Sequence, residues 1–294
     1  MGGSLEQAEL AIRQIAEFHS IWWESPEFTE MKWMHQWDKV QFLQHKEMFQ
    51  LGWNPFLEIM GHKVPDNILQ LGNRLGKHLV SVMSHVQEPP RTIAHFDYQL
   101  GNLFIAPSGS NTPLVVVDWQ LLTFGRGTFD VAFFLGGNIN SKDRSSKELD
   151  LLRIYHTTFI ENGVRDYSFD QCLYDYRLSM LYCLARFVIV VGAIGVASEQ
   201  ERIYCETIVP RYIAAVVTLI LKNYSRIDGC GYQTIKMVRH PNLWTEFTFL
   251  SPLLSLCFYL CGEDKHTVQS FEHRRQCSER QSREIILDEC PCHI

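Results

Sequence analysis

The chain has two short β-rich runs, NLFIA at 102–106 and PLVVVD at 113–118, separated by the turn-rich PSGSNT. Runs rich in β-branched residues and bounded by Gly, Pro, Ser and Asn are typical of strands joined by a turn. We therefore expect one antiparallel hairpin here. Because helical patterns lie on both sides of it, the sequence predicts a mostly helical α+β domain built around a small β element.

A symmetric register of this hairpin places Asn102 opposite Asp118 and Phe104 opposite Val116. Side chains directly opposite in an antiparallel pair stand roughly 5 Å apart on one face. The register thus predicts two oxygen donors side by side at the open end of the hairpin. An Asn carbonyl and an Asp carboxylate suit Mg²⁺, which usually takes one or two protein ligands and completes its shell with water and substrate phosphate. Asp97 precedes them in a tight loop and is the natural proton acceptor.

The rest of the first 222 residues has helical patterns. Ser4 and Gln7 form a capping box before an amphipathic segment that Pro26 ends. An aromatic-rich stretch follows at about 33–56, and a second helical segment spans about 64–86. Further helices are expected at 128–136, 145–162, about 170–197 and 199–222.

Composition narrows the partners and the compartment. The formal net charge is −6 with no block of like charge, so nucleic acid is not an expected partner. Nine cysteines without paired spacing, and a start without a secretory signal, favour a cytoplasmic location. The apolar segment 178–198 carries Arg186 and is expected to be a buried core helix, while 247–261 is short and broken by Pro252, so membrane association is not expected.

Two segments carry a family resemblance. HFDYQLGN at 95–102 resembles the catalytic loop of the kinase fold, with an Asp and an Asn five residues apart, and VVVDWQ at 115–120 resembles the metal-binding segment that follows it. Together they are similar to the aminoglycoside phosphotransferase and choline kinase-like families, including the ecdysteroid kinase-like branch with Asp-Trp-Gln at this point. The resemblance continues through GRGTFDVAFFLGGNINSKDR and covers about residues 4–222.

The resemblance implies a protein-kinase-like fold (α+β) and ATP-dependent phosphorylation of a small-molecule hydroxyl. Asp97 would be the catalytic residue, and Asn102 and Asp118 would hold Mg²⁺ on the phosphates of ATP. Structural support of the site would come from three further residues. These are His95, which would pack the loop, Gln120, and Asp130, which would brace the loop from behind.

The chain departs from the family pattern in two places. Phe96 stands where small-molecule kinases usually have Gly. No N-terminal lobe with a phosphate-covering loop and its Lys is recognisable, so residues 1–224 are expected to be the C-terminal lobe alone, truncated at its start, and 225–294 an unassigned extension. GNRLGKH at 72–78 resembles a Walker A motif, but its glycines are spaced wrongly and it lies within a helical pattern.

Two functional hypotheses therefore stay open. The chain is either part of a small-molecule kinase or a non-catalytic, kinase-like binding or regulatory protein. Without the surrounding match, Asp97 and Asp118 would read as ordinary turn and strand-end residues. Aminoglycoside, choline-like amine, steroid and acyl-chain hydroxyls are all compatible substrates.

Overall fold

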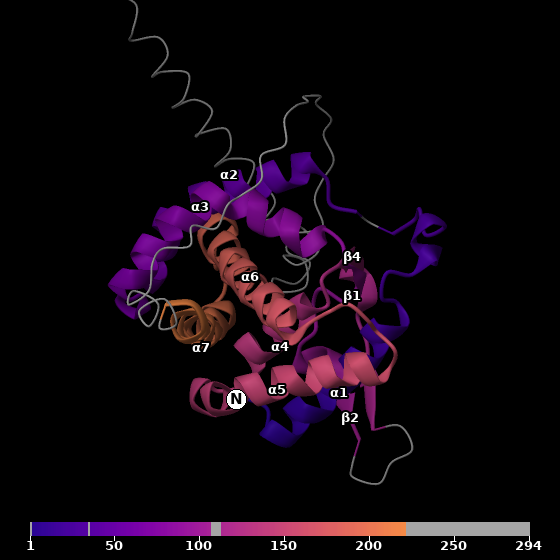
Figure 1. The fold of residues 1–294 in the computed structure, drawn as a ribbon. Coiled ribbons are helices and arrows are strands. Elements are labelled where there is room, and N and C mark those ends of the chain that lie inside the picture. Colours follow the sequence, from indigo (N-terminus) through magenta and orange to yellow (C-terminus); the bar gives the residue numbers. More distant parts are fainter. Residues whose placement is uncertain (1, 35, 107–112, 222–294) are drawn as a thin grey trace, which may run out of the picture.

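A computed structural model describes residues 2–34, 36–106 and 113–221. Its helices surround α6, which crosses the middle of the fold, with α2 and α3 on one side and α1 and α5 on the other (Figure 1). The α-helices are α1 Leu5–Ile21, α2 Lys39–Met60, α3 Asp66–Gln87, α4 Thr128–Asn138, α5 Ser141–Glu161, α6 Phe169–Val188 and α7 Glu199–Val216. Helices α6 and α7 continue into the π-helical turns Ile189–Ile194 and Val217–Leu221.

Most of the expected helices are confirmed, with one addition. The first begins at the predicted capping box, in which Ser4 and Gln7 each accept a hydrogen bond from the other's backbone N–H. The aromatic-rich stretch, to which no helix of its own was assigned, forms α2. Its buried face carries Phe42, Phe49 and Phe56, which are spaced seven residues apart and therefore share one side of the helix.

Within the described residues, four short strands form two separate two-stranded antiparallel sheets. The strands are β1 Thr92–Ala94, β2 Leu103–Ile105, β3 Leu114–Val116 and β4 Thr123–Gly125. The predicted hairpin is β2–β3, and its ladder extends to a hydrogen bond from Ala106 N–H to the Pro113 carbonyl at 2.9 Å. The pairing of β1 with β4 was not expected, and it closes residues 95–122 into one loop whose two ends lie together.

The predicted register of the hairpin is wrong by one residue. Leu103 pairs with Val116 and Phe104 pairs with Val115. The pleat explains the difference: Phe104 and Val115, which are 65% and 46% exposed, face each other in the observed register, whereas a shift by one would place each of them opposite a partly buried residue. Asn102 consequently lies opposite Val117, whose N–H donates to the Asn102 carbonyl at 3.0 Å.

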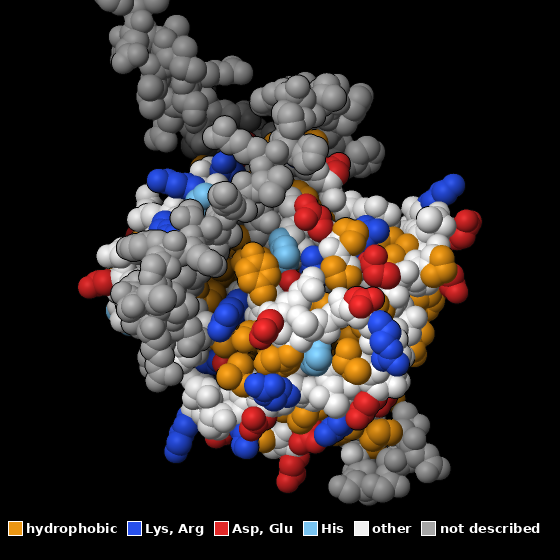
Figure 2. Space-filling model, viewed as in Figure 1, with side chains coloured by type: hydrophobic (Ala, Val, Ile, Leu, Met, Phe, Trp, Pro, Cys, Tyr) orange, Lys and Arg blue, Asp and Glu red, His pale blue; other side chains and the backbone are white. Residues whose placement is uncertain are grey.

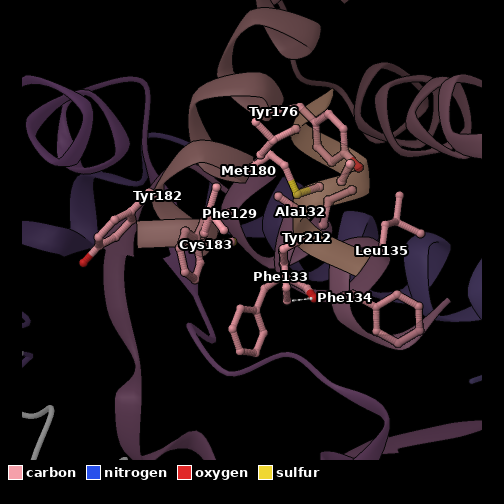
Figure 3. Packing of buried hydrophobic residues seen from close by; sticks show 14 of the residues in the cluster. Phe129, Ala132, Phe133, Phe134, Leu135, Tyr176, Met180, Tyr182, Cys183 and Tyr212 are labelled. Atoms are coloured by element: carbon pink, nitrogen blue, oxygen red, sulfur yellow. Dashed lines mark hydrogen bonds between the residues drawn. The ribbon is translucent and has the colours of Figure 1, made fainter. Parts of the chain in front are cut away.

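The core lies where α4, α6 and α7 meet (Figure 3). Phe129 and Phe133 of α4, Met180 and Cys183 of α6, and Tyr212 of α7 are buried together there. The Tyr212 hydroxyl donates to the Phe133 carbonyl at 2.7 Å, so the one polar group at the end of this ring has a partner. This core holds the start of α4, and therefore Asp130, in a fixed place.

Helix α2 approaches the π-helical turn after α6 through two glycines. A Cβ on Gly192 would lie 1.8 Å from the Gly52 carbonyl oxygen. Since that atom belongs to the backbone, Gly192→Ala should reduce the free energy of unfolding by about 1–3 kcal/mol. Denaturant unfolding checks this, with Gly61→Ala as the control, because a Cβ on Gly61 meets nothing within 4 Å. Equal stability of the two variants would contradict the close approach.

Two helical stretches, Phe169–Ile194 and Glu199–Ile220, are long and apolar enough to cross a membrane by length and composition. The same composition suits a core helix, and 67% and 50% of their most apolar windows are buried within the fold. On the face in Figure 2, basic and acidic side chains are interspersed without a block of one sign. The expected extension at 225–294, including the apolar run at 247–261, lies outside the described residues.

The segment GNRLGKH, which resembles a Walker A motif, lies within α3. An α-helix uses its backbone N–H groups internally, whereas a phosphate loop has to present them to the ligand. The segment is therefore an ordinary stretch of helix, whose Gly72, Leu75 and Gly76 are buried and whose polar residues are exposed.

Candidate functional site

The loop that leaves β1 is held from behind by Asp130. Its carboxylate accepts hydrogen bonds from the backbone N–H of His95 at 2.7 Å and of Phe96 at 2.8 Å. His19 Nε2 of α1 lies 3.1 Å from the same carboxylate, and all of these side chains are buried. One fully buried aspartate in the first turn of α4 thus determines how the chain leaves the strand.

Phe96 has a left-handed backbone, with φ of 67°. This conformation is costly for a bulky side chain and free of penalty for glycine, which explains physically why a glycine suits this position. Packing compensates for the strain: the ring stacks on Phe129 with centroids 4.0 Å apart. Arg186 Nη1 donates to the Phe96 carbonyl at 2.9 Å, and its guanidinium lies over the same ring.

His95 connects the loop to the strand that precedes Asp118. Its Nε2 lies 2.9 Å from the Val117 carbonyl, which can only accept, so Nε2 carries the proton. The other ring nitrogen, Nδ1, accepts from the Asp97 N–H at 3.3 Å. The neutral ring therefore joins the two predicted catalytic segments.

Asp97 is nearly fully buried, at 3% exposure, and both of its carboxylate oxygens have donors. Gln99 Nε2 donates to both at 3.1 and 3.2 Å, and Asn102 Nδ2 donates to Oδ2 at 3.0 Å and to the Asp97 carbonyl at 2.9 Å. Burial raises the pKa of Asp97, and the charge of Arg186 and these hydrogen bonds oppose the rise. A raised pKa makes the carboxylate a stronger base.

Asp118 lies just past the hairpin, again with a left-handed backbone (φ 64°), at the start of the 3₁₀ turn Trp119–Leu121. Its Oδ2 is buried and has no hydrogen-bond partner. Asn102 uses its amide nitrogen on Asp97, and its amide oxygen accepts no hydrogen bond from the described residues. A buried carboxylate oxygen without a partner is costly unless something binds it, and it and the Asn102 amide oxygen are of the donor types that a hard cation takes.

The described part of the chain contains no group of three or more His, Cys, Asp or Glu side chains arranged to hold a metal. The predicted pair is a smaller set, one carboxylate and one amide. Such a set matches a Mg²⁺ ion that keeps several of its positions for water and phosphate oxygens.

Gln120 is exposed, and in the described part of the chain no hydrogen bond joins its side chain to Asp97, Asn102 or Asp118. Its neighbour Trp119, by contrast, contacts a residue of the site directly. The indole packs on the His95 ring with centroids 4.6 Å apart, and its Nε1 donates to the Val116 carbonyl at 3.1 Å. Trp119 was not predicted as a support of the site.

Arg186 and His19 were also not predicted to support the site. Arg186 had a visible signal, because it is a lone charge in the otherwise apolar start of the segment 178–198, and such a residue needs a partner when buried. His19 lies on the buried face of α1, where its Nδ1 is 3.0 Å from the Tyr155 hydroxyl and its Nε2 reaches Asp130. Helical spacing does not distinguish a core histidine from one that braces a site.

The comparison with known families agrees with this geometry. No curated protein matches the chain significantly. The model of the ecdysteroid kinase-like family matches residues 1–165, which is more than half of the 294 residues and includes all of the residues just described except Arg186. A kinase-like fold is what this family implies, and the mostly helical structure with small sheets is consistent with it. The chain belongs to the ecdysteroid kinase-like family.

Proposed function

We propose that this protein transfers the terminal phosphoryl group of Mg-ATP to a hydroxyl group of a small molecule. The observation that supports this most directly is that Oδ2 of Asp118 is buried and has no hydrogen-bond partner. Asp118 directly follows Val117, whose backbone N–H is hydrogen-bonded to the Asn102 carbonyl. A structural aspartate at a strand end would normally have that oxygen in a turn hydrogen bond.

Each residue has a distinct part in this reaction. Asp97, held by Gln99 and Asn102, orients the substrate hydroxyl and accepts its proton. Asn102 and Asp118 would hold Mg²⁺ through their side-chain oxygens, and the ion would supply charge neutralisation at the phosphates. His95 and Asp130 fix the loop so that Asp97 and the metal ligands keep their relative position.

We further propose that the described residues form the C-terminal lobe of the kinase-like fold. In support, Phe104 and Val115 form an exposed apolar pair on the outer face of the hairpin, next to the metal ligands. An apolar surface at this place suits contact with a nucleotide base or with a second lobe. Transfer also needs a phosphate-covering loop and its Lys, which are not among the described residues.

The surroundings of Asp97 favour a neutral or anionic substrate. The charged side chain that acts most strongly on Asp97 is the cationic Arg186, which lies among the rings of Phe96, Phe129 and Phe133. A polycationic aminoglycoside would be repelled there, whereas an apolar alcohol would be accommodated. Together with the family to which the chain belongs, this makes an ecdysteroid hydroxyl the first substrate to test.

A non-catalytic binding protein is the second candidate, because the nucleotide-binding lobe is not among the described residues. Two measurements separate these functions: ADP release with Mg-ATP and hydroxylated compounds, and calorimetric titration with Mg-ATP. ADP release that needs both the compound and Mg²⁺ supports the kinase. Absence of both ADP release and nucleotide binding, in this chain and in any longer form that carries the second lobe, favours the binding protein.

Asp118→Ala tests the metal site separately from the fold. Since Oδ2 of Asp118 makes no hydrogen bond, its loss costs none, and the melting temperature should fall only by the few degrees that correspond to placing alanine, which tolerates a left-handed backbone less well than aspartate, at φ 64°. Transfer should fall by at least about 100-fold at a Mg²⁺ concentration that saturates the parent protein, as for loss of one electrostatic stabiliser. Asp150→Ala, on the exposed face of α5, is the control. Unchanged Mg²⁺ dependence in Asp118→Ala would rule out the assignment.

A further inference from the structure

Asn138, the last residue of α4, reaches from the helix to the loop that carries Asp97. Its side-chain oxygen Oδ1 accepts a hydrogen bond from the backbone N–H of Leu100 at 3.0 Å. Its side-chain Nδ2 donates to the Phe134 carbonyl, one turn earlier in α4, at 3.2 Å. Since a backbone N–H only donates and a carbonyl only accepts, the two partners fix which way the amide points. The side chain is therefore a defined bridge between α4 and the loop.

The turn that Asn138 holds carries the proposed metal ligand Asn102. Leu100 begins the 3₁₀ turn that ends at Asn102. The N–H of Leu100 is bound by Asn138, and its carbonyl accepts from the N–H of Leu103. A shift of Leu100 would therefore move Asn102, which lies two residues further along the same turn.

Helix α4 binds this loop on both sides of Asp97. Asp130, in the first turn of the helix, accepts from the two backbone N–H groups that come before Asp97. Asn138, eight residues later and about 12 Å further along the helix axis, binds the N–H of Leu100, which comes after it. Because one helix carries both acceptors, the proposed base and the turn of Asn102 are kept at a fixed separation.

The C-terminal end of α4 is itself held in place. The last carbonyls of a helix have no partner within the helix. Here the Gly137 carbonyl accepts from Arg211 Nη1 of α7 at 2.7 Å, and the Asn138 carbonyl accepts from the N–H of Gly3 at 2.8 Å. Arg211 also brings a positive charge to the negative end of the helix dipole. The side chain of Asn138 therefore extends from a fixed backbone.

We propose that Asn138 is a positioning residue for the metal site: its Oδ1 holds the turn of Asn102 where Asn102 and Asp118 can bind one Mg²⁺ ion. The proposal rests on the proposed function. A side chain that only ended α4 would need no partner outside the helix, whereas Oδ1 binds a residue 38 positions earlier in the chain. Removing a group that holds a metal ligand from behind typically costs about 10–100-fold in metal affinity or activity.

Two matched variants separate this role from general stability. Asn138→Leu removes the polar amide and keeps the approximate size of the side chain. Asn140→Leu is the control, because Asn140 is the N-cap of α5 and its amide bonds only to Asp143. Each change removes two hydrogen bonds of one amide, so both should lower the melting temperature by a few degrees. Only Asn138→Leu should alter the loop.

Amide hydrogen exchange is the first test, measured residue by residue by NMR on the full chain without metal or nucleotide. In Asn138→Leu the N–H of Leu100 should exchange at least about fivefold faster, because it loses its acceptor. The N–H of Asn102 should also exchange faster as the turn loosens, whereas the two N–H groups that Asp130 binds should keep their rates. None of these rates should change in Asn140→Leu. An unchanged rate at Leu100 or at Asn102 in Asn138→Leu overturns the proposal.

The Mg²⁺ dependence of transfer is the second test. Asn138→Leu should raise the Mg²⁺ concentration for half-maximal transfer about tenfold, and Asn140→Leu should leave it unchanged. Asn138→Asp keeps an acceptor for Leu100, so this concentration should not rise, although a negative charge at the end of α4 lowers the melting temperature. An unchanged Mg²⁺ dependence in Asn138→Leu, or an equal rise in Asn138→Asp, contradicts the positioning role.

The two proposals fail in different ways. If the parent protein transfers no phosphate to any compound, the proposed function fails, and the exchange rates still decide whether Asn138 positions the turn of Asn102. If the parent protein is active but Asn138→Leu has the same exchange rates and the same Mg²⁺ dependence, the role of Asn138 fails while the kinase stands.

Discussion

Asp97→Asn should lower phosphoryl transfer by about 10²–10⁴-fold, the range for loss of a positioned general base. Asparagine keeps the shape of the side chain and one acceptor for Gln99 and Asn102, so the loop should stay in place. The change therefore removes the proton acceptor and little else. The measurement is ADP release at saturating Mg-ATP and substrate, with Asp150→Asn as the exposed control.

The same variant should be at least as stable as the parent protein at neutral pH. Because burial raises the pKa of Asp97 in the folded chain above the ordinary aspartate value of 3.8, the ionised carboxylate is less favourable there than in the unfolded chain. Stability from this group is fully present below pH 3.8 and is lost as the pH rises through the raised folded pKa. Asp97→Asn does not lose this stability as the pH rises. At pH values above the folded pKa of Asp97, its melting temperature should therefore equal or exceed that of the parent protein.

The two measurements together exclude a general loss of structure as the reason for inactivity. A catalytic group held at the expense of stability is expected at an active site. If Asp97→Asn keeps full transfer activity, Asp97 is not the proton acceptor. If it is inactive and also strongly destabilised, its carboxylate is a structural group of the loop.

The candidate site residues could be proposed from the sequence alone because their spacing is a local pattern. The patterns are local: an Asp and an Asn lie five residues apart, and a second Asp follows the hairpin. They can be recognised without knowledge of the packing. The hairpin register could not be found in this way. It depends on which face of β2 and β3 is buried, and the short apolar runs do not show that Leu103 faces inward and Phe104 outward.

The supports of the site were harder to predict, because they come from distant parts of the chain. Asp130 lies close enough in sequence to belong to the family resemblance. His19 lies 111 residues before Asp130, and Arg186 lies 90 residues after Phe96. A buried charge signals that a partner exists but does not say which residue it is. The second sheet, β1 with β4, was missed because strands of three residues leave almost no pattern.

Asp130→Ala should reduce the free energy of unfolding by about 3–5 kcal/mol. The change leaves the backbone N–H groups of His95 and Phe96 and the His19 ring without their acceptor, all in a fully buried place. It also removes the group that holds Phe96 in its left-handed conformation. Thermal and denaturant unfolding measure the loss, which corresponds to a fall of roughly 6–20 °C in melting temperature.

Asp130→Asn separates the hydrogen bonds from the packing. Asparagine fills the same space and keeps one acceptor oxygen, but its amide group faces a backbone N–H that needs an acceptor. Its stability should therefore lie between those of the parent protein and Asp130→Ala. Transfer by Asp130→Asn should be reduced even well below its melting temperature, because Asp97 follows the two residues whose N–H groups Asp130 binds. If Asp130→Ala unfolds at the same temperature as the parent protein, the catalytic loop depends on Arg186 and the Phe96–Phe129 stack for its conformation, and Asp130 is not its brace.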